Sequence, residues 1–353
     1  MELSVMFFGS ESTLPPSDKY DDILAIAQAA DALGFKAVWT PERHFQDFGQ
    51  VFPNPSVIGA ALAVATRNIE IRAGSVVLPL HRPLRVAEEW AVIDNLSKGR
   101  IGVSVATGWH TKDFVLAPHR YADRRSHTLH DVDLLRAHWS GRDVECTDGV
   151  GETVPVRPQP TPYSSHLPLW LTTSGNPDTW IAAGERRMGV LAPGPSVAGH
   201  AKLAKNIRAY RAAHDAAPPQ PATTRPGLVT VMMHAYAAAT DATARAHVRE
   251  PLRGYLSSYL RQTTGSKDPA GPGSVKNDPA TLHRMTDFAL EQHLHGGSLI
   301  GSPRHCRETL ATLAETGVDE VACFVDFGLP REDILRSLTL LGEIRRDLTR
   351  RAA

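Results

Sequence analysis

The sequence feature that most constrains the fold is an alternation of short apolar runs with longer amphipathic stretches. Four apolar runs within the first 105 residues are predicted strands: Leu3–Phe8, Ala37–Trp39, Ile69–Leu78 and Ile101–Val105. The stretches between them have the helical period of apolar residues: Asp18–Gly34, Asn54–Ala65 and Pro83–Leu96. Strands that alternate with helices at this spacing are typical of a parallel sheet with right-handed crossovers.

The alternation continues towards the carboxyl terminus. Eight strands with intervening helices favour a (β/α)₈ TIM barrel of the α/β class over a doubly wound sheet. Residues 140–166 are predicted to form a loop with a small hairpin, and residues 262–279 a flexible insertion after a helix over Asp241–Leu260. We expect residues 1–353 to form a single domain. The four further strands are predicted at Pro168–Thr172, Met188–Leu191, Gly227–Tyr236 and Val318–Val325.

Composition argues against several classes of protein. Lys+Arg and Asp+Glu both total 38, so the formal net charge is zero. The sequence therefore lacks the excess of basic residues that is typical of nucleic-acid-binding proteins. No apolar run reaches the roughly 20 residues that span a bilayer, and the amino terminus lacks the features of a signal peptide. Three widely spaced cysteines form neither a disulfide framework nor a zinc motif. We therefore expect a cytoplasmic protein without a membrane or nucleic-acid partner.

Common nucleotide and metal motifs are missing from the sequence. No G-x-G-x-x-G follows a predicted strand, and neither G-x-x-x-x-G-K-[ST] nor H-E-x-x-H occurs. A nicotinamide on a Rossmann fold and a P-loop nucleotide site are therefore not expected. His127 and His130 lie on one predicted helix, but no third ligand accompanies them, so we interpret them as solvated side chains and expect no metal site.

Polar side chains follow three of the predicted strands, where a barrel places its active site. After the fifth strand, hydroxyls and a glycine at a helix amino terminus suit a phosphate, because free N–H groups and the helix dipole face the anion. Small residues within the third strand indicate that something approaches its backbone closely. Taken alone, the segment after the fourth strand fits a glycine turn with a packed tryptophan equally well. The residues concerned are Glu42, Arg43, His44, Gly74, Ser75, Thr107, His110, Thr173, Ser174 and Gly175.

Longer blocks resemble a known family. The chain is similar to the bacterial luciferase-like flavin monooxygenases in blocks such as GFKAVWTPERHF, PNPSVIGAAL and PLWLTTSGNPDTW. The segment from Arg72 to Pro118 is the longest and most specific block, and the resemblance spans nearly the whole chain. It is greatest to the branch found in secondary-metabolite gene clusters. The resemblance implies a (β/α)₈ barrel that binds reduced FMN at the carboxyl ends of its strands.

The resemblance also implies which residues bind the cofactor. In the family the flavin rests against a non-proline cis peptide, which falls here between Gly74 and Ser75. Some relatives carry cysteine and arginine after the fourth strand, and their absence here removes a guanidinium from the phosphate site. The cofactor-binding residues implied by the resemblance are Gly74, Ser75, Ala106, Thr107, Thr173, Ser174, Gly175 and Thr179.

Two histidines are the candidate catalytic residues. His44 matches the active-site histidine of the family, and an imidazole with a pKa near 6.5 can move a proton near neutral pH. His110 follows the fourth strand and is the second candidate. We interpret Glu42 and Arg43 as structural residues that orient the loop and pair with neighbouring strand ends.

The expected function is that of a two-component monooxygenase. It would take reduced FMN from a separate flavin reductase and use O₂ to oxygenate a small-molecule or carrier-protein-bound intermediate in natural product biosynthesis. A deazaflavin-dependent hydride-transfer enzyme on the same fold is the alternative, and a non-catalytic flavin-binding or scaffold protein is a third possibility. Relatives commonly dimerise through early barrel helices, so we expect a homodimer.

Overall fold

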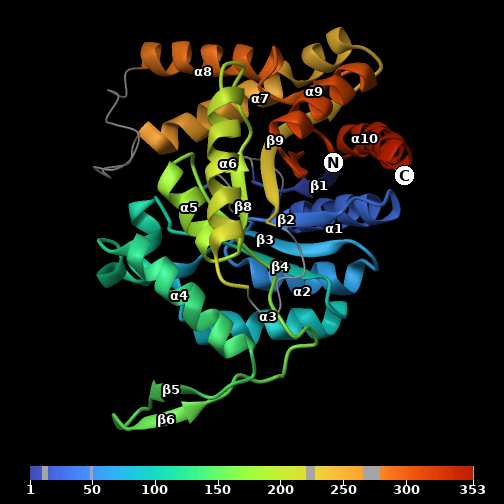
Figure 1. Cartoon of the computed structure of the whole chain (residues 1–353). Coiled ribbons are helices and arrows are strands. Elements are labelled where there is room, and N and C mark those ends of the chain that lie inside the picture. The colour runs from blue at the N-terminus through green and yellow to red at the C-terminus, as the bar shows by residue number, and fades with distance from the viewer. Residues whose placement is uncertain (10–14, 48–50, 220–226, 265–278, 353) are drawn as a thin grey trace.

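Eight parallel strands close into a barrel in the computed structural model, which describes residues 1–9, 15–47, 51–219, 227–264 and 279–352. Strand β1 pairs with β2 and β11, and pairing of β8 with β9 closes the ring. The predicted TIM barrel is therefore confirmed (Figure 1). The barrel strands are β1 (Glu2–Met6), β2 (Ala37–Thr40), β3 (Glu70–Val77), β4 (Ile101–Ala106), β7 (Leu169–Thr172), β8 (Gly189–Pro193), β9 (Val229–Ala237) and β11 (Glu320–Phe324).

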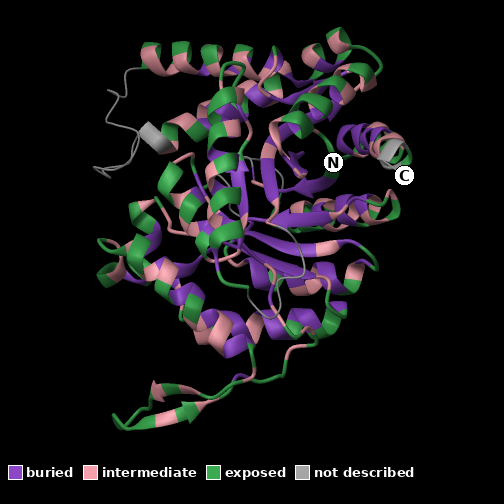
Figure 2. Ribbon diagram, in the orientation of Figure 1, coloured by how far each residue is buried: buried purple, intermediate pink, exposed green. Residues whose placement is uncertain are grey.

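Helices surround the barrel, and several begin where the sequence predicts. Proline at a first helical position starts α2, α3 and α5, and the side chains of Asn54 and Asn176 cap α2 and α5. Figure 2 shows buried strands inside a shell of partly exposed helices. The helices are α1 (Pro16–Ala32), α2 (Pro55–Ala65), α3 (Pro83–Ser97), α4 (Arg124–Trp139), α5 (Pro177–Glu185), α6 (His200–Ala216), α7 (Asp241–Thr264), α8 (Pro279–Leu294), α9 (Pro303–Thr316) and α10 (Arg331–Ala352).

Three segments refine the sequence prediction. The expected hairpin is present as antiparallel strands β5 (Val144–Thr147) and β6 (Thr153–Val156), which extend away from the barrel (Figure 1). A ninth parallel strand, β10 (Leu299–Gly301), pairs with β9 and was not predicted. Helix α7 continues four residues beyond its predicted end, and residues 265–278 of the predicted insertion lie outside the described residues.

None of the described helices is long and apolar enough to cross a membrane.

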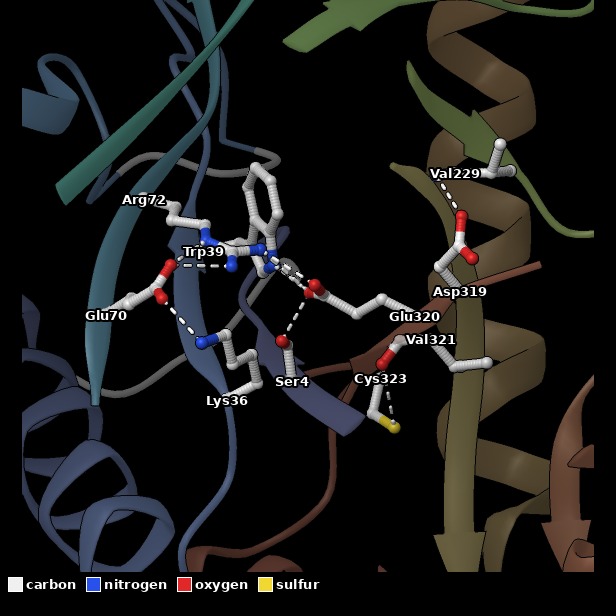
Figure 3. Close-up of polar contacts among 10 residues, drawn as sticks. All are labelled: Ser4, Lys36, Trp39, Glu70, Arg72, Val229, Asp319, Glu320, Val321 and Cys323. Atoms are coloured by element: carbon white, nitrogen blue, oxygen red, sulfur yellow. Dashed lines mark hydrogen bonds and ion pairs between the residues drawn. The ribbon is translucent and has the colours of Figure 1, made fainter. Parts of the chain in front are cut away.

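A buried polar cluster fills part of the barrel interior (Figure 3). The guanidinium of Arg72 contacts the rings of Trp39 and Trp170, with its Cζ 4.8 and 4.6 Å from their centroids, and the two rings contact each other edge-on. It donates to both carboxylate oxygens of Glu320, at 3.0 and 2.9 Å, and to Glu70 at 2.6 Å. Because every charge here has a hydrogen-bonded partner, the cluster crosslinks β2, β3, β7 and β11 without leaving a lone buried ion.

Candidate active site

Glu42 organises the loop that follows β2. Its carboxylate Oε1 accepts hydrogen bonds from Nε2 of His44 and Nε2 of His81, both at 2.7 Å. Its Oε2 accepts a hydrogen bond from the backbone N–H of Val77, at 2.7 Å. We refer to Glu42, His44 and His81 as the Glu42 cluster. The cluster ties the loop after β2 to the end of β3, which confirms that Glu42 pairs with a neighbouring strand end.

The hydrogen bonds determine the protonation of the Glu42 cluster. Burial opposes the ionised form of Glu42, but the hydrogen bonds from His44, His81 and the Val77 N–H outweigh it and lower the pKa of the carboxyl. Burial opposes protonation of His81, but the Glu42 carboxylate outweighs it and raises the pKa of that imidazole. An ionised carboxylate only accepts, so both histidines donate from Nε2. Among the described residues, Nδ1 of His44 has no hydrogen-bond partner.

Small residues and hydroxyls line the interior of the barrel next to this cluster. The peptide bond between Gly74 and Ser75 is cis, at the position that the resemblance implied. A Cβ on Gly74 would lie 2.9 Å from Cε of Met6, so packing favours glycine there. The hydroxyls of Ser75 and Ser104 both hydrogen-bond that of Thr172, the latter at 2.7 Å. This row of hydroxyls joins β3, β4 and β7 at their carboxyl halves.

The turn after β4 contains the second candidate histidine. Gly108 has a φ of +74°, and a Cβ there would lie 2.8 Å from atoms of Phe114 and Val77, so a larger residue does not fit. Nδ1 of His110 lies 3.6 Å from Oδ1 of Asp113, and neither of these buried atoms has a hydrogen-bond partner within the described ranges. The carboxylate of Asp113 therefore lies just beyond hydrogen-bonding distance of the His110 ring.

The turn after β7 has the features expected of a phosphate site. Thr173 is buried, and its hydroxyl accepts a hydrogen bond from the N–H of Gly175 at 3.1 Å, while Ser174 is exposed. Thr179 follows in the first turn of α5. A Cβ on Gly175, which has a φ of +103°, would meet only Nζ of Lys202 within 4 Å. The turn thus has open space, a hydroxyl and a cation beside a helix amino terminus.

A second cation lies beside the neighbouring turn. β4 and β7 pair with Val105 opposite Leu171, so the strand ends that lead into Thr107 and Thr173 are neighbours. Nε of Arg124, at the start of α4, donates to the carbonyl of Gly108 at 3.2 Å. The sequence has no arginine directly after β4. The structure places Arg124 and Lys202, from two different helices, beside the turns where that charge would be needed.

The opposite wall of the barrel end is aromatic. Phe8, after β1, packs edge-on against Phe324 with 4.9 Å between centroids, and it lies 6.3 Å from the ring of Tyr255 on α7. His234 on β9 is buried among these rings, and Nε2 of this imidazole has no partner among the described residues. Burial and the neighbouring His293 lower the pKa of His234 well below its usual range, so this imidazole is neutral.

Asp326 closes the seam between the first and last barrel strands. Its carboxylate accepts hydrogen bonds from the N–H groups of Phe8, at 2.9 Å, and Gly9, at 2.7 Å. Burial raises the pKa of Asp326 to about 6, although these donors favour the ionised form. Asp326 thus holds the strand end that carries Phe8.

The structure brings the predicted residues to one end of the barrel. These are His44, Gly74, Ser75, Ala106, Thr107, His110, Thr173, Ser174, Gly175 and Thr179. Sequence reasoning missed His81, Asp113 and Lys202. His81 follows β3 and Asp113 follows His110 by three residues, so both could have been found from their nearness to strand ends. Lys202 lies on α6 and reaches the site only because α6 packs against α5 (Figure 1).

Comparisons with known sequences identify relatives of the chain. The profile of the luciferase-like monooxygenase family matches residues 1–320. The oxygenase component of the flavin-dependent trigonelline monooxygenase of Acinetobacter baylyi is 28% identical over 166 residues, which is 46% of this chain and 43% of that protein. The alkanal monooxygenase alpha chain of the Kryptophanaron alfredi symbiont is 36% identical over 92 residues, 26% of each chain. The matches therefore span less than half the length of these curated relatives.

Solved structures share the fold over almost the whole chain. A monooxygenase from Streptomyces bottropensis superposes with a TM-score of 0.78 at 22% identity, covering 99% of this chain and 100% of that one. The oxygenating constituent of 3,6-diketocamphane monooxygenase from Pseudomonas putida, in complex with FMN, has a TM-score of 0.74 at 18% identity and 97% coverage of both chains. An F420-dependent secondary alcohol dehydrogenase has a TM-score of 0.70 at 16% identity and 98% coverage of both.

Proposed function

Because the chain belongs to the luciferase-like monooxygenase family, we propose that it is a monooxygenase that uses reduced FMN and O₂ to oxygenate an organic substrate. The observation that carries the proposal is the Glu42 cluster. It holds His44, a titratable imidazole, at the end of β2, one strand from the cis peptide and two strands from the turn that carries Thr107. A proton carrier and a phosphate-binding turn at the same barrel end are what a flavin oxygenase needs.

The residues present fit the phosphate and ring of FMN. Thr107, Ser174 and the open space at Gly175 would hold the phosphate, with Thr173 and Thr179 adjacent and the positive charge of Lys202 close by. Gly74 and Ser75 would lie against the ring, because neither carries a bulky side chain. Bound FMN would supply the electrons and the reaction with O₂, whereas the protein would supply position, proton transfer and exclusion of water.

The proposed role of His44 is proton transfer at Nδ1. Glu42 occupies Nε2, so the other ring nitrogen exchanges protons with the reacting molecule. His81 donates to the same carboxylate and keeps Glu42 ionised. His110, with Asp113 behind it, is proposed as a second proton-handling group on the opposite side of β3 from β2.

The proposal extends to partners and pathway. The Acinetobacter relative is an oxygenase component, and this supports a separate flavin reductase as the source of reduced FMN. The resemblance to secondary-metabolite enzymes supports a small-molecule or carrier-bound intermediate of natural product biosynthesis as the substrate. The missing Rossmann motif supports an external reductant as well.

Hydride transfer with the deazaflavin F420 is the second candidate function. The shared fold of the F420-dependent dehydrogenase supports it, since that fold serves both chemistries. The two cofactors differ in their tails, so binding separates the candidates without knowledge of the substrate.

The proposed cofactor is tested by anaerobic titration of the protein with reduced FMN and with reduced F420. We expect saturable binding of reduced FMN, about fivefold weaker in Lys202→Ala because an exposed cation contributes about 1 kcal/mol. Lys205→Ala, on the same helix, is the control and should bind like the wild type. Tight binding of reduced F420 with none of reduced FMN would replace the proposed function by the second candidate.

A further inference from the structure

Arg43 is a cation whose hydrogen-bonding capacity is largely unused. It follows Glu42 at the end of β2, and its Cζ lies 4.1 Å from the centroid of the Phe8 ring. Its only hydrogen bond from the side chain to a described residue goes from Nη1 to the carbonyl of Glu42, at 3.1 Å. A guanidinium carries five N–H donors, so most of them have no partner within the described ranges.

No carboxylate of the described residues forms an ion pair with Arg43. The adjacent Glu42 carboxylate is already engaged by His44, His81 and the Val77 N–H. Asp113 attracts the guanidinium only from beyond ion-pair distance. Other arginines in the barrel differ from it, since Arg72, for example, is bonded to two carboxylates. Burial lowers the pKa of Arg43 but leaves it charged, because no protein environment deprotonates a guanidinium near neutral pH.

The surroundings of Arg43 are aromatic, and the phenol groups of Tyr255 and Tyr259 favour its charged form. Phe8 contacts Phe324, and Tyr255 and Tyr259 lie 6.3 and 6.5 Å from the Phe8 ring. Aromatic faces strengthen the interaction of a guanidinium with an anion by excluding water. The planar guanidinium can also donate two parallel hydrogen bonds to the two oxygens of one carboxylate. A partly accessible cation in such a setting stabilises an anion much more than it would in water.

From these contacts we infer that Arg43 binds a carboxylate of the substrate, whose apolar body packs on the aromatic wall of Phe8, Tyr255 and Phe324. The substrate class is then an aryl or hydrophobic carboxylic acid. The inference rests on the proposed function, because it takes the carboxyl end of the barrel as the substrate-binding end. It also revises the sequence interpretation of Arg43 as purely structural: Glu42 carries that role, and the guanidinium beside it remains available.

The inference is tested by calorimetric titration of the flavin-free protein with phenylacetate and with its neutral counterpart, phenylacetamide. We expect the wild type to bind the acid at least about tenfold more tightly than the amide, the effect of one charge-assisted hydrogen-bonded pair. Arg43→Gln should abolish this preference, and Arg43→Lys should retain part of it. Arg85→Gln, which removes an exposed arginine of α3, should retain all of it.

Several outcomes would overturn the inference. These are equal binding of acid and amide by the wild type, no binding of either probe, and an acid preference that survives in Arg43→Gln. If Arg43→Gln does not fold, the comparison of the two probes on the wild type and on Arg43→Lys remains decisive. The titrations contain no flavin, so their failure would leave the proposed oxygenation untouched, and failure of FMN binding would leave this result untouched.

Discussion

At the residue scale, Glu42 links the structure of the site to its chemistry. One carboxylate accepts from two imidazoles and a backbone N–H, so the loop after β2 and the end of β3 are fixed relative to each other. The same hydrogen bonds fix the tautomer of His44. A positioned proton carrier and an ordered strand end therefore depend on a single side chain.

Replacing Glu42 by glutamine should change the titration of His81. The neutral amide removes the negative charge that outweighs burial, so the pKa of His81 should fall in Glu42→Gln, as measured by NMR of the imidazole signals. The variant should also lose about 1–3 kcal/mol of unfolding free energy, because one buried donor loses its acceptor. Glu308→Gln, at an exposed pair on α9, is the control. An unchanged pKa of His81 would show that Glu42 does not stabilise the protonated imidazole of His81.

The sequence predicted single residues well where they directly follow a strand. His44, Thr107 and Ser174 could be placed because the carboxyl ends of parallel strands meet at one end of a barrel. Lys202 and Arg124 could not, since their distance to the site depends on how α6 and α4 cross the barrel. Arg43 was predicted but interpreted as structural, because sequence alone does not show which charged groups already have partners.

At the element scale, the polar cluster inside the barrel connects strands that are far apart in sequence. Lys36, Glu70, Arg72 and Glu320 come from the loop before β2 and from β3 and β11, and they form a continuous chain of ion pairs. Burial opposes the charge of Glu70, but Arg72 and Lys36 outweigh it and lower the pKa of its carboxyl to about 2. The ion pairs of Glu70 with Arg72 and Lys36 therefore stabilise the barrel only while Glu70 is ionised.

Acid should destabilise the protein through Glu70 in a defined window. The folded-state pKa of about 2 lies below the unfolded value of 4.5, so the contribution is complete above pH 4.5 and is lost as pH falls towards 2. The shift corresponds to about 3 kcal/mol. Urea unfolding between pH 3 and 6 should show a smaller pH slope for Glu70→Gln than for the wild type and for the control Glu88→Gln. Equal slopes for all three proteins would contradict this assignment.

Element boundaries were predictable where local chemistry marks them. Asn54 and Asn176, each followed by proline, start α2 and α5 where expected. β10 was missed because three residues, Leu299–Gly301, are too short to show a period, and only pairing with the longer β9 makes them a strand. Helix α7 extends past its predicted end at Leu260. Arg261 and its neighbours continue the helix, although the polar sequence that follows them predicted a loop.

At the scale of the whole molecule, the outer face of α2 and α3 exposes four large apolar side chains. Val57 and Val64 on α2 are 71% and 70% exposed, and Val92 and Leu96 on α3 are 44% and 46% exposed. The two helices pack against each other, so these side chains lie on adjacent helices. An apolar surface of this kind supports the homodimer expected from the sequence, because burying it against a second copy removes it from water.

Charges on this surface should dissociate the dimer. We expect the wild type to have the mass of two chains by light scattering, and the double variant Val57→Glu, Val64→Glu to have the mass of one. Val150→Glu, in the exposed turn between β5 and β6, is the control and should remain dimeric. A monomeric wild type would exclude the dimer. A double variant that is still dimeric would place the interface elsewhere.

The whole fold was predictable from the sequence, whereas the fold only limits the function to a small number of chemistries. Eight strands with intervening helices were enough for the barrel, and the family follows from matches along residues 1–320. The same barrel serves FMN and F420 chemistry, so the choice between them depends on a few side chains at the strand ends and on the tail of the cofactor.

The most direct test of the central claim is the reaction of the reduced protein–FMN complex with O₂ in a rapid-mixing spectrophotometer. We expect O₂ to oxidise the reduced FMN bound to the wild type in two phases, the second of which releases hydrogen peroxide and is limited by proton transfer. His44→Ala should slow that phase by about 10²-fold, the usual effect of removing a proton-transfer group. His305→Ala, on α9, should behave like the wild type. Oxidation in a single phase at the rate of free FMN, identical in wild type and His44→Ala, would contradict the account.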